Sequence, residues 1–276
     1  MKIDSHQHFW RFGPEYEWID DSIAQLRRDF LAEHLLPLLA DQGYQGCIAV
    51  QARQTLEETE FLLDLANDNE FIRGVVGWVD LRGDYSTEMY SNKLKGVRHI
   101  VQAEPPGFLD DDKFRNGVSR LPAANLAYDL LIRNHQLEEA IRFVQALPNV
   151  KIVLDHIAKP DIRGGQWEQW AGQIREIAKC ENLWVKLSGM AFEADWETWT
   201  SDTLSPYVDH VLDCFGPKRC MIGSDWPVCL AAGDYRDVMQ AIETLLSPTE
   251  KEDVLGRTAA DFYGLYNDVP GRFASV

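Results

Sequence analysis

The chain has 276 residues, of which 45% are hydrophobic, and it includes nine tryptophans, nine tyrosines and twelve phenylalanines. This composition supports a folded core and excludes intrinsic disorder. The formal net charge is −17, from 27 Lys and Arg against 44 Asp and Glu. Such an excess of acid argues against nucleic acids and anionic membrane surfaces as partners, whereas a small anionic ligand stays open because a few local cations can override the global charge.

Eight short apolar segments typical of β-strands recur along the chain, and helical patterns separate them. We expect strands at Lys2–Phe9, Gly46–Ala52, Ile72–Leu81, Leu94–Ala103, Asp129–Arg133, Lys151–Ile157, Leu183–Ser188 and Arg219–Ser224. We expect helices at Thr55–Asn69, His135–Leu147, Gln166–Cys180, Ser201–Phe215, Tyr235–Leu246 and Pro248–Tyr263. Strands that alternate with helices form parallel sheets. Eight such units, with no glycine-rich dinucleotide fingerprint, predict a single-domain α/β protein, a (β/α)8 TIM-type barrel over residues 1–276.

Two longer insertions follow expected strands. Arg11–Asp29 follows the first strand and Ala103–Asn125 follows the fourth. Because the carboxyl ends of barrel strands form the active face, both insertions should rim that face. The acidic triplet Asp110–Asp112 favours a solvated loop tip over a calcium site, since the glycine and glutamate of a calcium loop do not follow it.

The five cysteines are scattered and form no CxxC pair. Neither a disulfide framework nor a cysteine-rich zinc site is therefore expected. The first strand is expected to begin at Lys2, and no apolar run approaches the ~18 residues of a membrane span. We expect a soluble protein of the reducing cytoplasm.

The first strand ends in an HxH pair. Side chains two residues apart on a strand point to the same face, so His6 and His8 should project together and Gln7 away from them. Two imidazoles at a barrel mouth can bind a metal or polarise a carbonyl group. The pair is a weak signal by itself.

Two further strands end in residues that could act with this pair. The sixth strand runs into Asp155-His156 and the eighth into Asp225. Three imidazoles and one carboxylate at one mouth suit a metal site, and Asp225 is a natural general base for water. Structural alternatives exist for each, because His156 could pair with Asp155 and Asp225 could cap the following helix.

Several other side chains at strand ends could contact a substrate. The candidates are Arg53, Arg98, His99, Lys159 and Trp226. Arg98 and His99 are neighbours on a strand, so at most one of them can face the barrel interior. The alternative for a charge embedded in an apolar strand, which also applies to Lys186, is a structural ion pair.

Motifs over nearly the whole chain resemble those of the amidohydrolase superfamily, and more narrowly its branch of sugar-acid lactonases. The motifs are DSHQHFW, GVVGWVDL, KGVRHIVQAEP, DLLIRNHQL, LDHIAKP, LWVKLSGM and IGSDWP. The resemblance implies a (β/α)8 barrel that hydrolyses aldonolactones, such as L-fuconolactone or L-rhamnonolactone, in bacterial sugar catabolism. By position, it implies that His6, His8, His156 and Asp225 are the functional residues.

The chain departs from many amidohydrolases at its fourth and fifth strands. Those proteins carry a bridging Lys or Glu on the fourth strand and a His at the end of the fifth. Here the fourth strand ends in Arg98-His99 and the fifth in Leu131-Ile132-Arg133. A two-metal centre is therefore not expected. One divalent ion such as Zn²⁺, held by His6, His8, His156 and Asp225, and a metal-independent site both stay open.

The expected function is hydrolysis of a small sugar lactone, with Asp225 taking a proton from water and the histidines polarising the carbonyl group. A metal-dependent decarboxylase of the same superfamily and a non-catalytic sugar-acid binder are the two rivals. The sequence leaves open which sugar the lactone derives from, its ring size and the oligomeric state.

Overall fold

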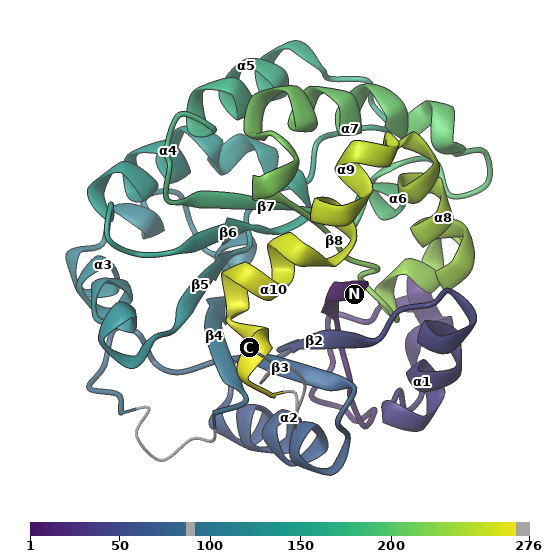
Figure 1. Cartoon of the computed structure of the whole chain (residues 1–276). Helices are drawn as coiled ribbons and strands as arrows, with labels where there is room; N and C mark the ends of the chain where they lie inside the picture. The colour runs from purple at the N-terminus through teal and green to yellow at the C-terminus, as the bar shows by residue number, and fades with distance from the viewer. Residues whose placement is uncertain (87–91, 269–276) are drawn as a thin grey trace, which may run out of the picture.

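The computed structural model describes residues 1–86 and 92–268, and it shows the expected barrel (Figure 1). Eight strands form one sheet in chain order, and each strand pairs in parallel with the next. They are β1 (Ile3–Gln7), β2 (Gly46–Val50), β3 (Ile72–Gly77), β4 (Leu94–His99), β5 (Ala127–Leu130), β6 (Ile152–Leu154), β7 (Leu183–Leu187) and β8 (Cys220–Ile222). The prediction of a (β/α)8 barrel is confirmed.

The barrel closes where β1 meets the segment after β8. Gln7 and Trp226 form a parallel bridge. The amide of His8 donates to the carbonyl of Trp226 at 2.6 Å, and the amide of Asp225 donates to the carbonyl of His6 at 2.8 Å. The closing hydrogen bonds thus tie the HxH segment directly to the predicted general base.

Most of the helices surround the barrel as an outer ring, whereas the last α-helix crosses one end of it (Figure 1). They are α1 (Ala32–Asp41), α2 (Leu56–Asp68), α3 (Asp112–Ser119), α4 (Leu137–Ala146), α5 (Glu168–Ile177), α6 (Met190–Glu193), α7 (Ser201–Phe215), α8 (Tyr235–Leu245), α9 (Pro248–Glu252) and α10 (Thr258–Tyr263). The prediction for α7 matches both ends of the helix. Helices α1, α3 and α6 were not expected from the sequence.

Several predicted elements have other bounds in the structure. The third strand ends at Gly77 rather than Leu81, and the fourth at His99 rather than Ala103. The fifth strand begins two residues earlier than expected and ends at Leu130, because its ladder with β4 pairs Gly96–His99 with Ala127–Leu130. The helix expected over Pro248–Tyr263 breaks at Gly256. A Cβ at Gly256 would lie 1.9 Å from the carbonyl oxygen of Met1, so the chain bends where the N-terminus crosses it.

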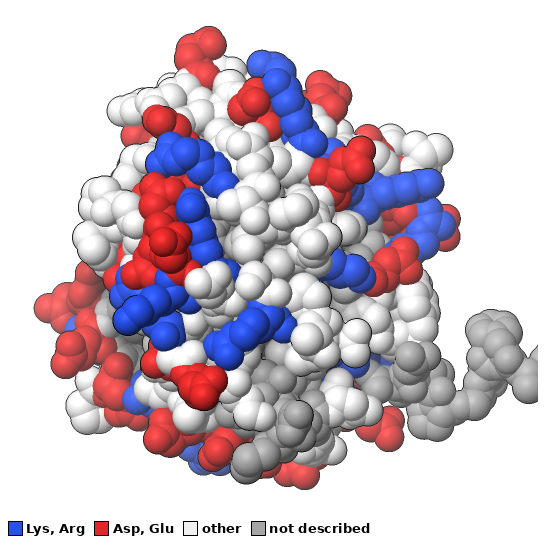
Figure 2. All heavy atoms as spheres, turned by 90° about the vertical axis from the view of Figure 1, so that its left-hand side faces the viewer, with Lys and Arg blue, Asp and Glu red and all other residues white. Residues whose placement is uncertain are grey.

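The acidic triplet Asp110–Asp112 lies at the start of α3. The Asp111 carboxylate accepts from the amide of Phe114 at 2.9 Å and so caps the helix, while Asp110 pairs with Arg142 at 3.1 Å. On the side of the molecule where α3 and α4 lie, acidic and basic side chains stand beside one another (Figure 2). The triplet is therefore a capping and ion-pairing element.

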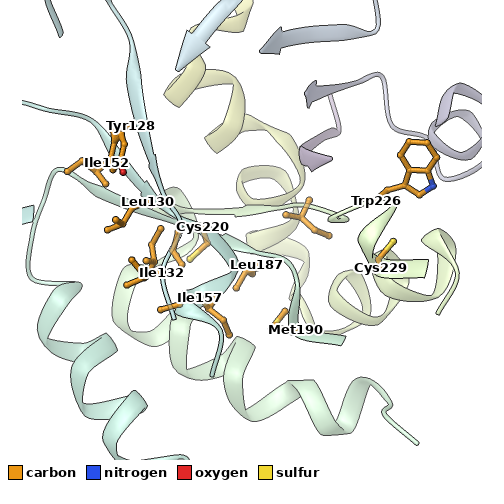
Figure 3. Close-up of a cluster of buried hydrophobic side chains, with 14 of the residues drawn as sticks. Tyr128, Leu130, Ile132, Ile152, Ile157, Leu187, Met190, Cys220, Trp226 and Cys229 are labelled. Atoms are coloured by element: carbon orange, nitrogen blue, oxygen red, sulfur yellow. The ribbon is translucent and has the colours of Figure 1, made fainter. Parts of the chain in front are cut away.

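The apolar core has two layers. A large cluster lies between the strands and the outer helices, and Figure 3 shows part of it, with Tyr128, Ile152, Leu187 and Cys220 from β5 to β8. A smaller cluster fills the barrel interior, where residues of α10 pack against inward side chains of the strands. Helix α10 lies across one end of the barrel (Figure 1). Among the helices described, none is long and apolar enough to cross a membrane.

Candidate active site

Three imidazoles converge on one carboxylate at the end of the barrel opposite α10. The Oδ1 atom of Asp225 lies 3.2 Å from Nε2 of His8, 3.8 Å from Nε2 of His6 and 3.9 Å from Nε2 of His156. The ring centroid of His6 lies 5.0 Å from that of His8 and 4.4 Å from that of His156. All four side chains are buried. Residues more than 200 positions apart thus form one compact cluster.

Unusual backbone conformations place two of these residues. His156, Ile157, Ala158 and Lys159 follow β6 with φ values of 52°, 48°, 62° and 49°, and Asp225 has a φ of 58°. Left-handed conformations are costly for residues other than glycine, above all for a β-branched residue such as Ile157. Backbone strain of this kind gathers at functional sites because the surrounding structure must hold it.

Gly189 allows His156 to lie where it does. Its φ is 68°, and a Cβ there would lie 2.6 Å from Nδ1 of His156. The neighbouring Ser188 bonds to the same nitrogen through Oγ at 2.9 Å. The turn after β7 therefore supports one edge of the His156 ring and leaves Nε2 facing Asp225.

The His8 ring has a defined orientation. Its Nδ1 lies 2.8 Å from the carbonyl oxygen of Val50, and because a carbonyl only accepts, Nδ1 carries a hydrogen. Nε2 is then the atom that faces Asp225. A histidine held this way by a backbone carbonyl is typical of metal ligands and of catalytic imidazoles.

Burial sets the charge states of the cluster. It lowers the pKa of His156 to about 4 and holds the pKa of His6 well below its usual value. Burial alone would raise the pKa of Asp225, but the charge interaction with His156 and the close contact with Nε2 of His8 outweigh it and leave the pKa below its usual range. At neutral pH, Asp225 is an anion beside neutral His6 and His156.

His6 is also the end of a buried polar network. Its Nδ1 lies 3.3 Å from Oδ1 of Asp155 and 3.2 Å from Nζ of Lys186, and its Nε2 lies 3.2 Å from Nη1 of Arg98. Arg98 also donates to Oδ2 of Asp155 at 3.0 Å. Asp155 thus forms ion pairs with Arg98 and Lys186 and contacts His6, rather than its sequence neighbour His156.

The other predicted contact residues are more scattered. Arg98 faces the interior, whereas His99 faces outward, bonds to Glu104 at 2.8 Å and stacks on Phe108. This opposition follows from strand alternation. Trp226 is 2% exposed and packs between Phe9 and Phe30.

Arg53 and Lys159 lie at partly exposed positions after β2 and β6. Arg53 lies 3.7 Å from Glu15 and over the ring of Tyr16. Burial lowers the pKa of Lys159, an effect that the charges of Asp225 and Glu193 oppose. The ammonium group of Lys159 makes no hydrogen bond or close ion pair to the described part of the chain, so it can bind a substrate oxygen.

Sequence reasoning missed several residues of the site. Asp129 and Asp155 hold the buried cations, and Glu58 accepts from the amides of Ala52 at 3.0 Å and Arg53 at 2.7 Å. A signal existed for Asp129, because it is a lone acid between apolar residues of β5. No local pattern marks Glu58, which lies on an ordinary helical face.

The cluster fits one metal ion by its donor chemistry. Nitrogen atoms of His6 and His8 and a carboxylate oxygen of Asp225 all lie within 4.8 Å of one another. Two donors that share a tetrahedral Zn²⁺ at ~2.1 Å lie about 3.4 Å apart, close to the 3.2–3.9 Å that separate Asp225 from the three imidazoles. The Arg98 guanidinium beside His6 opposes a second positive charge and should moderate the affinity.

The family model for amidohydrolases matches residues 3–265. The chain belongs to the amidohydrolase family. It is 40% identical to an L-fucono-1,5-lactonase of Burkholderia multivorans over 96% of each chain, and 35% identical to an L-fucono-1,5-lactonase of Burkholderia ambifaria over 95% of each. A crystal structure of an amidohydrolase from Burkholderia multivorans with bound Zn superposes with a TM-score of 0.92 at 40% identity, and the match covers 96% of this chain and 99% of the other.

Proposed function

We propose that this protein is a lactonase that hydrolyses a sugar-derived aldonolactone, such as L-fuconolactone or L-rhamnonolactone, to the aldonic acid in sugar catabolism. The observation that carries the proposal is the ionised Asp225 carboxylate, which faces three imidazole nitrogens at 3.2–3.9 Å. The L-fucono-1,5-lactonases, which are 35–40% identical over nearly the whole chain, support this substrate class.

The reaction follows from the charge states of the cluster. Asp225 accepts a proton from a water molecule as the water oxygen attacks the lactone carbonyl carbon. The resulting oxyanion is stabilised by hydrogen-bond donors and by the Lys159 ammonium group. When the bond between that carbon and the ring oxygen breaks, Asp225 returns the proton to the leaving oxygen, which becomes a hydroxyl group.

One divalent ion fits the proposal. His6, His8, His156 and Asp225 would hold it, and a bound Zn²⁺ supplies Lewis acidity that polarises a carbonyl group. The Zn-bound amidohydrolase at 40% identity supports zinc as the ion to test first.

The proposed substrate contacts are narrower than the sequence-based set. We retain Arg53 and Lys159, because both are partly exposed and follow the carboxyl ends of β2 and β6, the end of the barrel at which the cluster lies. Arg98 contacts His6 and Asp155, so we assign it to the support of His6. The structure gives His99 and Trp226 packing contacts, and we propose no substrate contact for either. We also propose a cytoplasmic location, in which the five thiols would stay reduced.

A hydrolysis screen tests the proposal. Acid release from a panel of aldonolactones of both ring sizes is followed with a pH indicator, in the untreated protein, after chelation and after Zn²⁺ is added back. We expect turnover of one group of sugar lactones. Carbon dioxide release from aromatic acids would favour the decarboxylase, and saturable lactone binding without acid release would favour a non-catalytic binder.

A further inference from the structure

A chain of buried polar groups runs through the barrel interior from α10 towards the candidate active site. The hydroxyl of Tyr263 on α10 donates to Oδ2 of Asp129 on β5 at 2.8 Å. The same oxygen accepts from Nζ of Lys186 on β7 at 2.5 Å. Asp129 and Lys186 are fully buried, and Tyr263 is 4% exposed.

The chain continues to His6. Nζ of Lys186 lies 3.1 Å from Oδ1 of Asp155 and 3.2 Å from Nδ1 of His6. Lys186 is thus enclosed by two carboxylates and one imidazole. Three contacts therefore separate the hydroxyl of Tyr263, at the end of the barrel that α10 covers, from a histidine of the catalytic cluster.

The fold by itself does not require these charges. Barrel interiors are usually filled by branched apolar side chains. Buried ion pairs contribute little to stability compared with apolar residues of the same volume, because desolvation offsets their attraction. Burial and the neighbouring Asp155 also raise the pKa of Asp129 to about 6 despite Lys186. The network therefore calls for a role beyond stability.

The contacts of His6 define that role. Nε2 lies 3.2 Å from Nη1 of Arg98, and because a guanidinium group only donates, Nε2 carries the lone pair and Nδ1 the hydrogen. Nδ1 lies 3.2 Å from Nζ of Lys186 and 3.3 Å from Oδ1 of Asp155. Since an ammonium group cannot accept, the Nδ1 hydrogen points to Asp155, and Lys186 directs its own hydrogens to Asp129 and Asp155. Nε2, with its lone pair, is the atom that faces Asp225. Asp155 can accept the hydrogen of Nδ1 only while its carboxylate stays in place, and the ion pair with Lys186 keeps it there.

We propose that Lys186 is a positioning residue for His6, and that Asp129 and Tyr263 hold Lys186 in place. The proposal deepens the proposed function and rests on it for its kinetic consequences. It makes α10 part of the catalytic apparatus, although this helix contacts no substrate.

The first test compares two tyrosines that each bury one hydroxyl group. Tyr263→Phe removes the hydrogen bond to Asp129. Tyr128→Phe is the matched control, because the hydroxyl of Tyr128 is buried on the same strand as Asp129 and, among the described residues, has no side-chain hydrogen bond to the network. We expect Tyr263→Phe to lower kcat about three- to tenfold with KM within twofold, and Tyr128→Phe to leave both within twofold. Equal kcat values in the two variants would overturn the proposal.

The second test adds a spectroscopic readout, the tautomer of His6, that can be measured without turnover. Asp129→Asn keeps the shape of the side chain and removes the charge that balances Lys186. In 15N-histidine spectra, we expect the wild-type protein and Tyr128→Phe to show His6 with hydrogen on Nδ1. Asp129→Asn should show a mixture of the two tautomers, with kcat lowered about 10- to 100-fold, as for other groups that orient a catalytic histidine.

The two proposals fail in different ways. An unchanged His6 tautomer in both Asp129→Asn and Tyr263→Phe would refute the positioning role, whatever the substrate is. A wild-type protein that hydrolyses no lactone, but whose His6 tautomer responds to Asp129→Asn, would refute the lactonase function and retain the positioning role.

Discussion

Individual residues of the candidate site owe their properties to their neighbours. Burial disfavours the charged forms of His6, His156 and Asp225 alike, yet only the two histidines are neutral at neutral pH. The pKa of Asp225 instead lies below its usual range, because its interactions with His156, His8 and His6 outweigh burial, so this carboxylate is already ionised well below neutral pH. Asp225 is therefore ionised at neutral pH and free to accept a proton from a nearby water molecule, which is the role that hydrolysis requires.

Replacement of this carboxylate tests the general base. We expect Asp225→Asn to lower kcat about 10²- to 10⁴-fold, because the amide cannot take a proton from water. The melting temperature and the circular dichroism spectrum should show a folded protein. Asp84→Asn changes a fully exposed carboxylate and should leave kcat unchanged. Turnover of Asp225→Asn near that of Asp84→Asn would contradict the assignment.

At the scale of elements, the turns after the strands carry the strain and the polar supports. The left-handed turn after β6 directs His156 towards Asp225, and Gly189 after β7 leaves room for its ring. After β2, Glu58 of α2 binds two backbone amides and holds the turn that carries Arg53. Each turn is supported by an element distant in sequence or by the following helix.

Glu58 makes the contribution of this turn to folding stability depend on pH. Burial raises its pKa from 4.5 to about 7 despite the two amide hydrogen bonds. A carboxyl group whose pKa is higher in the folded state favours folding most below pH 4.5, and that contribution is lost as the pH rises through 7. Oε1 of Glu58 has no partner in the described structure, so an amide can replace the acid without breaking a bond.

We therefore expect Glu58→Gln to be more stable than the wild type at pH 8 and similar to it near pH 5. Each unit of pKa difference corresponds to about 1.4 kcal/mol in the free energy of unfolding. Melting temperatures of both proteins between pH 5 and pH 8 measure the difference, and Glu57→Gln on the exposed face of α2 is the control. A difference that does not grow with pH would show that Glu58 is already ionised at the lower pH.

At the scale of the whole molecule, the candidate site lies on the seam that closes the barrel. His6 and His8 come from β1, Asp225 follows β8, and backbone hydrogen bonds join the two segments. A ligand bound by both segments therefore bridges the first and last strands. Binding at this seam should stabilise the entire barrel, since a ligand that binds only the folded state shifts the folding equilibrium.

Zinc titration measures that coupling. We expect Zn²⁺ to raise the melting temperature of the wild type and chelation to reverse the rise, with about 2.7 kcal/mol gained at a hundredfold excess over Kd. His8→Gln should lose most of the shift. His99→Gln, which changes a histidine packed against Phe108, should retain it. Equal shifts in the two variants would place the ion elsewhere.

The sequence by itself determined the eight strand–helix units and indicated candidate catalytic residues at their ends. Period-two and period-3.6 patterns are local properties, and His6, His8, His156 and Asp225 stand out because they follow apolar strands. The sequence patterns did not predict where β5 begins or that the last helical segment breaks at Gly256. The pairing with β4 determines where β5 begins, and the close approach of Met1 determines the break at Gly256.

Only the tertiary structure decided which charges meet. Asp129, Asp155 and Lys186 are isolated polar residues in three different strands or turns, and nothing local indicates that they join one network with His6. Their charge states, and that of Asp225, depend on desolvation and on the distances to partners that only barrel closure brings near. Sequence patterns therefore indicate which side chains are candidates for the chemistry, whereas long-range packing sets the protonation state and the orientation of each.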